Sequence, residues 1–219
     1  MHCNLFQCNE ANCNEMKIIA IGWNYPKHNE EMENARNARP VIFCKPETAL
    51  IKDGKPFFLP DFSDCVEYET ELVVRINRLG KNIAEKFAGR YYAEASIGID
   101  FTARDLQKQL REAGSPWDIC KGFDNSAPVG KFLDLGTIGK DVQDLHFRLD
   151  INGTTVQKGY SGNMIFPVDK IISEASRYFT VKTGDLIFTG TPEGVGKVNI
   201  GDRLQGYIED ELVLDFYVR

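Results

Sequence analysis

Residues 67–74, Glu-Tyr-Glu-Thr-Glu-Leu-Val-Val, place acidic side chains at every second position before an apolar, β-branched run. Side chains two residues apart on a strand share a face, so Glu67, Glu69 and Glu71 share one side of the predicted strand 66–76. The apolar neighbours predict a buried face, where like charges are costly without a counter-charge. A divalent cation between two of these carboxylates would supply the counter-charge. The alternative is a solvated strand edge, which would tolerate the like charges. Parity does not choose among the three glutamates.

A third acid, Asp100, ends the predicted strand 95–99. It could cap the helix that follows, although Thr102 could serve that role equally well. Carboxylate oxygens without Cys or His favour Mg²⁺ or Mn²⁺ over Zn²⁺, and Ca²⁺ is a further candidate. The sequence therefore predicts a metal site that combines Asp100 with two of the glutamates.

Most of the remaining chain alternates as short strands between turn signals, with Asn152-Gly153 as a hairpin turn. Besides 66–76 and 95–99, the predicted strands are 17–22, 41–44, 145–151, the return from 155, 185–189 and 204–218. Helical spacing is confined to 28–37, 103–113 and 169–178. Because strands dominate and helices only decorate them, we predict an α+β, mostly β fold with a few short peripheral helices.

Composition limits the classes of function. The 219 residues suit one domain, and the apolar fraction of 42% with 26% charged residues is ordinary for a globular protein. The net charge of −6 gives no electrostatic reason to bind nucleic acid or an anionic membrane. No apolar run is long enough to span a bilayer. We therefore expect neither a nucleic-acid nor a membrane partner.

The first fifteen residues differ from the rest. Residues 1–15 contain His2 and three cysteines but neither the basic start nor the apolar stretch of a secretory signal. We expect a non-native or disordered extension before a single domain over 16–219; a Cys/His metal knuckle is the alternative, although it lacks the C-x₂-C pairs of zinc sites. The three cysteines after residue 15 are scattered without a spacing that suggests disulfide pairs. They predict reduced thiols and a cytoplasmic location. They are Cys44, Cys65 and Cys120.

Several motifs accompany the glutamate strand in a fixed order. They are G-W-N-Y-P-K-H-N-E-E-M, F-C-K-P, E-x-E-L, I-D-F-T-A-R-D-L-Q, C-K-G-F-D and T-G-T-P-E-G-V-G. Together they resemble the fumarylacetoacetate hydrolase family, especially its short single-domain acylpyruvate hydrolases and oxaloacetate decarboxylases. The resemblance covers residues 17–219. It implies a β-roll core, usually a homodimer, with Mg²⁺ or Mn²⁺ at its mouth.

The resemblance also assigns roles. It gives the metal to Glu69, Glu71 and Asp100 and leaves Glu67 as a neighbour. Residues at matching positions hold the substrate in the family, and these are Arg104, Gln107, Lys121 and Thr191. From the residues alone, Arg104 and Gln107 share a helix face, and Lys121 falls in the next predicted strand. Each residue also has an ordinary alternative. Arg104 could face Asp105 or solvent, Lys121 could be an exposed strand lysine, and Thr191 could belong to a simple turn. Lys121 is also a candidate catalytic residue.

A His–Glu pair completes the predicted site. His28 and Glu31 lie three residues apart on the predicted helix, so Glu31 can orient the imidazole. A solvated surface pair is the alternative, whereas hydrolytic members of the family carry such a pair on a lid. We therefore expect Glu31 to polarise His28, and His28 to activate water; His146 is expected to be a surface or packing residue. Trp23 stands where the family often has Arg. The loss of this cation near the mouth of the site could change which substrate acid binds.

These features predict a divalent-metal enzyme that cleaves C–C bonds of small 2-oxo-carboxylates, acylpyruvates or oxaloacetate, through a metal-bound enolate. The alternative is an isomerase or hydratase of unsaturated 2-oxo-dioates, which needs no hydrolytic water. A non-catalytic metal-binding β module is the remaining reading. In that module, the conjunction of Arg104, Gln107 and Lys121 would have no role.

Overall fold

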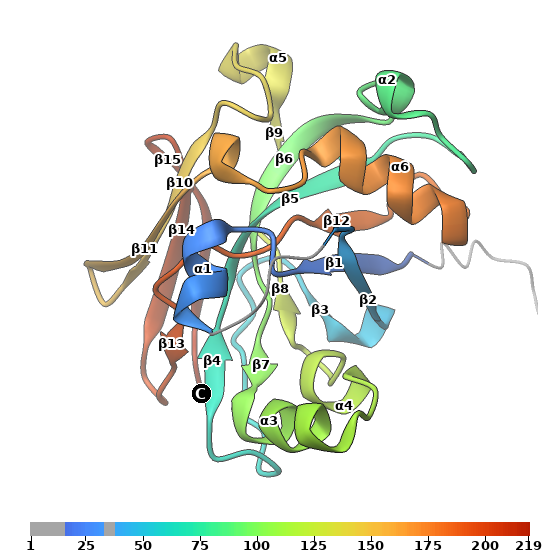
Figure 1. Ribbon diagram of the computed structural model, residues 1–219. Helices are drawn as coiled ribbons and strands as arrows, with labels where there is room; N and C mark the ends of the chain where they lie inside the picture. Colours follow the sequence, from blue (N-terminus) through green and yellow to red (C-terminus); the bar gives the residue numbers. More distant parts are fainter. Residues whose placement is uncertain (1–15, 33–37) are drawn as a thin grey trace, which may run out of the picture.

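Two sheets contain most of the strands in the computed structural model, which describes residues 16–32 and 38–219 (Figure 1). The six-stranded sheet has the order β2 (Val41–Lys45), β1 (Ile18–Gly22), β12 (Leu186–Phe188), β5 (Thr70–Ile76), β6 (Tyr92–Ile99) and β9 (Leu133–Asp134). The four-stranded sheet has the order β11 (Thr154–Tyr160), β10 (His146–Ile151), β14 (Arg203–Ile208) and β15 (Glu211–Tyr217). Within these two sheets only β1 and β12 pair in parallel.

Two smaller sheets extend this framework. One has the order β13 (Gly196–Lys197), β4 (Val66–Tyr68) and β7 (Thr102–Ala103), and the other pairs β3 (Leu50–Ile51) with β8 (Ala127–Pro128). The chain therefore passes from the small sheet into the large one between β4 and β5. It passes back between β6 and β7, and both crossings lie at the site described below.

The core lies between the two main sheets. Leu72 and Ile97 from the larger sheet and Leu149 and Phe216 from the smaller one belong to one buried apolar cluster. Each such side chain contributes roughly 1.5–3 kcal/mol when it leaves water. The sheets approach closely at Gly206, where a Cβ atom would lie only 2.8 Å from a methyl carbon of Ile97. A larger residue there would force the layers apart.

The helices lie around the sheets (Figure 1). The α-helices in the described residues are α1 (Pro26–Glu31), α2 (Glu85–Ala88), α3 (Arg104–Ala113), α4 (Asp118–Lys121), α5 (Leu135–Ile138) and α6 (Val168–Tyr178), with 3₁₀ turns at Glu47–Ala49 and Ser161–Asn163. The longest, α6, buries Val168, Ile171, Ile172 and Ala175 in the core and packs against α2. No helix within the described ranges is long and apolar enough to cross a membrane.

The predicted mostly β class with short helices is confirmed, while several element boundaries were wrong. The strand predicted over 66–76 is interrupted at Glu69, because its two halves pair in different sheets. Thr102 does not cap a helix, because it pairs with Glu67 in the small sheet, and Ala103 precedes α3 without a side-chain cap. The exposed helix predicted over 28–37 is α1, which buries His28; residues 33–37 lie outside the described part.

The cysteines of the body are free thiols, as predicted. They are Cys44, Cys65 and Cys120. The extension 1–15, with its alternative metal knuckle, lies outside the described residues.

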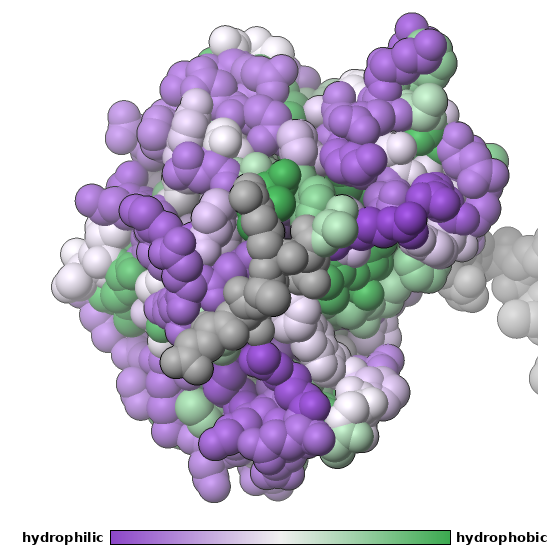
Figure 2. Space-filling model, viewed as in Figure 1, coloured by the Kyte–Doolittle hydropathy of each residue, from purple (hydrophilic) through white to green (hydrophobic). Residues whose placement is uncertain are grey.

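Apolar residues gather on one face of the molecule, below α6 and over β1 and β2 (Figure 2). A hollow of about 470 Å³ in this region is lined partly by Ile42 and Cys44 of β2 and by Phe179, which follows α6. Strand β2 is an edge of the larger sheet. Edge strands are sites where another chain can pair or pack.

Candidate active site

The two sheet crossings lie side by side and position the acidic residues. Glu69 stands between β4 and β5, and Asp100 follows β6. The Asp100 amide donates a hydrogen bond to the Glu69 carbonyl at 2.8 Å. Both segments leave one sheet for another at this level, so the side chains of Glu69 and Asp100 meet where the chain changes sheets.

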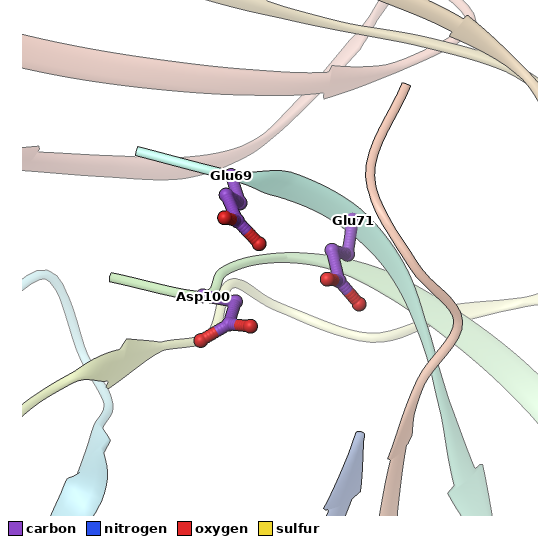
Figure 3. Close-up of side chains that lie close together, drawn as sticks. All are labelled: Glu69, Glu71 and Asp100. Carbon is purple, nitrogen blue, oxygen red and sulfur yellow. The ribbon is translucent and has the colours of Figure 1, made fainter. Parts of the chain in front are cut away.

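Three carboxylates converge where the chain changes sheets (Figure 3). One oxygen from each of Glu69, Glu71 and Asp100 lies within 4.8 Å of the others, and all three side chains are buried. Glu67 lies outside this group, with its carboxylate 2.7 Å from Nε of Arg104. The geometry thus selects Glu69, Glu71 and Asp100 as residues that could hold a metal ion, a choice that strand parity left open.

Cations already neutralise two of these carboxylates. Nζ of Lys121 donates to Glu69 and to Asp100, at 2.7 Å in each case. Nη2 of Arg104 donates to the second oxygen of Glu69 at 2.6 Å. Burial opposes ionisation of Glu69, but the charges of Lys121 and Arg104 outweigh it and hold its pKa below the usual range.

Glu71 differs from its neighbours. Its carboxylate accepts a hydrogen bond from the Gly190 amide at 2.7 Å, and it takes part in none of the ion pairs within the described residues. Burial, followed by the charges of Asp100 and Glu69, raises its pKa well above its ordinary value. An all-oxygen donor set with one carboxylate lacking a cationic partner fits a hard divalent ion.

Gly190 makes the approach to Glu71 feasible. Its φ of +97° lies in the region that favours glycine, and a Cβ atom there would lie 2.6 Å from Cβ of Asn24. Glycine therefore allows the T-G-T-P loop to place an amide against the buried carboxylate.

Lys121 occupies a different element from the one predicted. It is the last residue of α4 rather than a strand residue, and its side chain is buried. Its Nζ also donates to Thr102 Oγ1 at 2.6 Å. Asp100 and Glu69 raise its pKa against the opposing effect of burial, which is the largest single influence. Lys121 is therefore held as a cation between two of the acidic residues.

Lys45 is a site residue that sequence reasoning missed. It ends β2, is 1% exposed, and its Nζ lies 2.6 Å from Asp100 Oδ1. The same ammonium donates to the Ser126 hydroxyl at 3.0 Å and to the carbonyl of Lys121. A signal was present, since this lysine closes the otherwise apolar run Val-Ile-Phe-Cys.

The predicted substrate residues line one small hollow. Arg104 and Gln107 share a helix face as predicted, with Arg104 Nη1 donating to Gln107 Oε1 at 2.5 Å. The buried Thr191 hydroxyl donates to the Thr70 carbonyl at 3.0 Å. Arg104, Gln107, Lys121 and Thr191 all line a hollow of about 20 Å³ together with Glu69 and His28.

His28 of the His–Glu pair also lines this hollow. His28 Nδ1 lies 3.3 Å from Glu31 Oε2, and His28 is 4% exposed. The Glu31 carboxylate accepts a hydrogen bond from the Gly194 amide at 3.3 Å, which holds α1 against the T-G-T-P-E-G loop. His28 is therefore not the solvated surface residue of the alternative reading. His146, in contrast, is exposed at the start of β10, as predicted.

Aromatic residues form the rest of the wall. Trp23, Phe43 and Trp117 line the hollow, and only Trp23 had been singled out in the sequence. A larger hollow of about 680 Å³ lies elsewhere, around Met16, Arg75 and Phe132. Among the described residues, the carboxylate triad is the only group of three arranged to hold a metal, so chemistry points to the smaller hollow.

The fold and the site together define a mostly β protein with a buried triad of carboxylates suited to a divalent cation. A family model described as fumarylacetoacetate (FAA) hydrolase C-terminal matches residues 17–214. The chain belongs to the fumarylacetoacetate hydrolase family.

Named relatives are enzymes with different reactions. The mitochondrial oxaloacetate tautomerase FAHD1 of Bos taurus is 37% identical over 201 residues, covering 92% of this chain and 90% of the relative. Fumarylpyruvate hydrolase from Pseudomonas aeruginosa, solved with Mn²⁺ and pyruvate, has a TM-score of 0.87 and 34% identity, covering 93% of this chain and 89% of that one. A 5-carboxymethyl-2-hydroxymuconate delta-isomerase from Mycobacterium smegmatis has a TM-score of 0.81 and 34% identity, with coverage of 93% and 78%.

Proposed function

We propose that the protein is a divalent-metal-dependent enzyme that cleaves C–C bonds of small 2-oxo-carboxylates, with hydrolysis of 3-acylpyruvates as its reaction. The observation that carries this proposal is the buried triad, in which Glu71 lacks a cationic partner, together with the buried His28, which pairs with the exposed Glu31. Glu69, Glu71 and Asp100 would hold Mg²⁺ or Mn²⁺, with Ca²⁺ as a further candidate. The Mn²⁺ and pyruvate named for the Pseudomonas relative support this assignment.

The residues around the triad suit a 2-oxo-carboxylate. A bound cation would act as a Lewis acid on the 2-oxo group and stabilise the negative charge that develops there. Arg104, Gln107, Lys121 and Thr191 would surround the carboxylate end of the substrate, because they line the same hollow. Arg104 and Gln107 would donate hydrogen bonds to that carboxylate, and the Lys121 ammonium would contribute its positive charge. Lys121 would also help to neutralise charge as the bond breaks.

Hydrolysis requires a base, and we assign this role to His28. Glu31 accepts from one ring nitrogen, which leaves the other to take a proton from water. The water oxygen bonds to the distal carbonyl carbon, and the bond from that carbon to C3 breaks with its electron pair left on the pyruvate half. The proton held by His28 then returns to C3. One water is consumed, and pyruvate and a carboxylic acid are formed.

The second candidate is tautomerisation or isomerisation without bond cleavage, as the names of the bovine and mycobacterial relatives suggest. It needs proton transfer at C3 but no attacking water. A buried His28 oriented by Glu31 favours hydrolysis, because isomerisation does not require a water-activating pair. Decarboxylation of oxaloacetate, which leaves the same pyruvate half, is a further outcome that product analysis separates.

His28→Ala tests the proposed base. We expect kcat for acetylpyruvate to fall by about 10²–10⁴-fold, the range typical of general-base catalysis, while Mn²⁺ affinity measured by titration stays unchanged. His146→Ala is the matched control, since this histidine is exposed at the start of β10, in the four-stranded sheet, which contains none of the triad residues. Hydrolysis at the parental rate in His28→Ala would exclude this base.

A small 2-oxo acid is the proposed partner, without nucleic acid or membrane, and a homodimer is the proposed assembly. The cytoplasmic location stays a prediction, whereas the name of the bovine relative describes that protein as mitochondrial.

A further inference from the structure

An aromatic wall runs from the charged centre of the hollow toward α1. Lys121 Nζ lies 5.4 Å from the ring centroid of Phe43, and Phe43 meets Trp117 edge-on with centroids 5.9 Å apart. Trp117 in turn meets Trp23 edge-on at 5.3 Å. All three rings line the hollow that holds His28 and Glu69. A substrate anchored at the carboxylates therefore has aromatic surface along its remaining length.

The lysine and arginine side chains that line the hollow, Lys121 and Arg104, are paired with carboxylates of the protein. Arg104 is bonded to Glu67 and Glu69, and Lys121 to Glu69 and Asp100. Arg111 lies over the indole of Trp23, 5.7 Å from the ring centroid, but is not among the residues that line the hollow. A second carboxylate on the substrate would thus lie against the aromatic rings of this wall. Such a carboxylate loses its hydration without gaining an ion pair.

The fold holds Trp23 in place despite an unfavourable backbone. Its φ of +60° is uncommon for a bulky side chain and costs free energy. Neighbours fix this conformation. Asn29 Nδ2 donates to the Trp23 carbonyl at 3.2 Å, and Asn24 Nδ2 donates to the Thr189 carbonyl at 2.7 Å. Strained residues that their surroundings hold in this way cluster at ligand sites.

We infer that the edge-on pair Trp23–Trp117 is the specificity determinant for the distal group of the substrate and selects 3-acylpyruvates with an uncharged acyl end over those with a second carboxylate. This inference rests on the proposed function. Trp23 acts by contact with the acyl group, and Trp117 supports its indole. The reacting bond and the triad are the same for both kinds of substrate, so selection appears in KM more than in kcat.

Two substrates of equal length test this inference. Butyrylpyruvate and succinylpyruvate differ only in a terminal methyl against a terminal carboxylate. With the Mn²⁺-loaded protein we expect kcat/KM to favour butyrylpyruvate by on the order of 10²-fold, since a mismatched group in an apolar pocket has an effect of this size. Trp23→Arg should lower KM for succinylpyruvate and raise it for butyrylpyruvate. Trp23→Phe, which keeps an apolar ring, should retain the parental preference.

Binding gives a second readout. Trp23 and Trp117 are the two tryptophans of the chain, so intrinsic fluorescence reports on this wall. In a His28→Ala background, quenching should give a lower Kd for butyrylpyruvate than for succinylpyruvate. Equal or tighter binding of succinylpyruvate overturns the inference, even if both are hydrolysed. Discrimination in fluorescence without turnover of either substrate supports the aromatic wall and contradicts the proposed reaction.

Discussion

Glu71 is the residue on which the proposed metal site depends most. Glu69 and Asp100 each contact a lysine, whereas Glu71 has only the Gly190 amide among the polar contacts found in the described chain. Burial and the two neighbouring carboxylates raise its pKa. In the metal-free protein, ionising this group costs stability that a bound cation would restore.

The direction of the pH effect follows from this shift. Because the folded-state pKa of Glu71 lies above the unfolded value, its contribution to stability is complete below the unfolded pKa. That contribution is lost as pH rises toward the folded pKa. We expect Glu71→Gln, in the presence of a chelator, to have a higher Tm than the parent near neutral pH. The difference should shrink as the pH is lowered toward the ordinary range of a glutamate.

Thermal unfolding followed by circular dichroism from about pH 5 to pH 8 measures this difference. Glu211→Gln is the matched control, because Glu211 forms an exposed ion pair with Lys131. Added Mn²⁺ should raise the Tm of the parent and leave that of Glu71→Gln nearly unchanged. A lower Tm for Glu71→Gln at every pH would mean that Glu71 stabilises the metal-free fold, contrary to expectation.

Individual residues differ in how far the sequence could place them. Glu69 and Glu71 were predictable, because parity on a strand is a local property. The exclusion of Glu67 was not, since it depends on Arg104 approaching from α3. Lys45 was missed because a lone lysine after an apolar strand indicates burial at most and does not identify Asp100, distant in the sequence, as its partner.

At the scale of elements, Lys45 links three segments that form the site. From the end of β2 its ammonium reaches Asp100 after β6, the carbonyl of Lys121 in α4, and Ser126 before β8. Burial lowers the pKa of Lys45, while Asp100 opposes that effect. These contacts link the edge strand β2 of the larger sheet to α4 and to the segments that contain Asp100 and Ser126.

We expect Lys45→Met to destabilise the protein by about 3–5 kcal/mol, because it leaves a buried carboxylate without one of its partners. Urea unfolding of the two proteins measures this loss. Lys131→Met is the control, since its exposed pair with Glu211 should contribute at most about 1 kcal/mol. Equal midpoints for Lys45→Met and Lys131→Met would show that the buried network does not hold these elements together.

Element types were easier to predict than element ends. Alternation identified β10 and its hairpin, because one face of that strand packs on the core. The break at Glu69 was not visible, since β4 and β5 continue one alternating pattern although they pair in different sheets. Lys121 was assigned to a strand because α4 is only four residues long and too short for helical periodicity.

At the scale of the molecule, the apolar face over β1 and β2 bears on assembly (Figure 2). Monomeric proteins rarely leave large apolar patches uncovered, and β2 is an edge strand. We therefore expect a homodimer. Light scattering during gel filtration should give twice the mass of one chain at micromolar concentration. The mass of a single chain under those conditions would contradict this expectation.

The most direct measurement of the proposed function is product formation from acetylpyruvate by protein stripped with EDTA and then reloaded with Mg²⁺ or Mn²⁺. We predict that the stripped protein is inactive, that either metal restores turnover, and that pyruvate and acetate form in equal amounts. Undiminished hydrolysis after metal removal would contradict the role of the carboxylate triad. Bound metal without cleavage of acetylpyruvate would contradict the hydrolytic reaction and favour isomerisation.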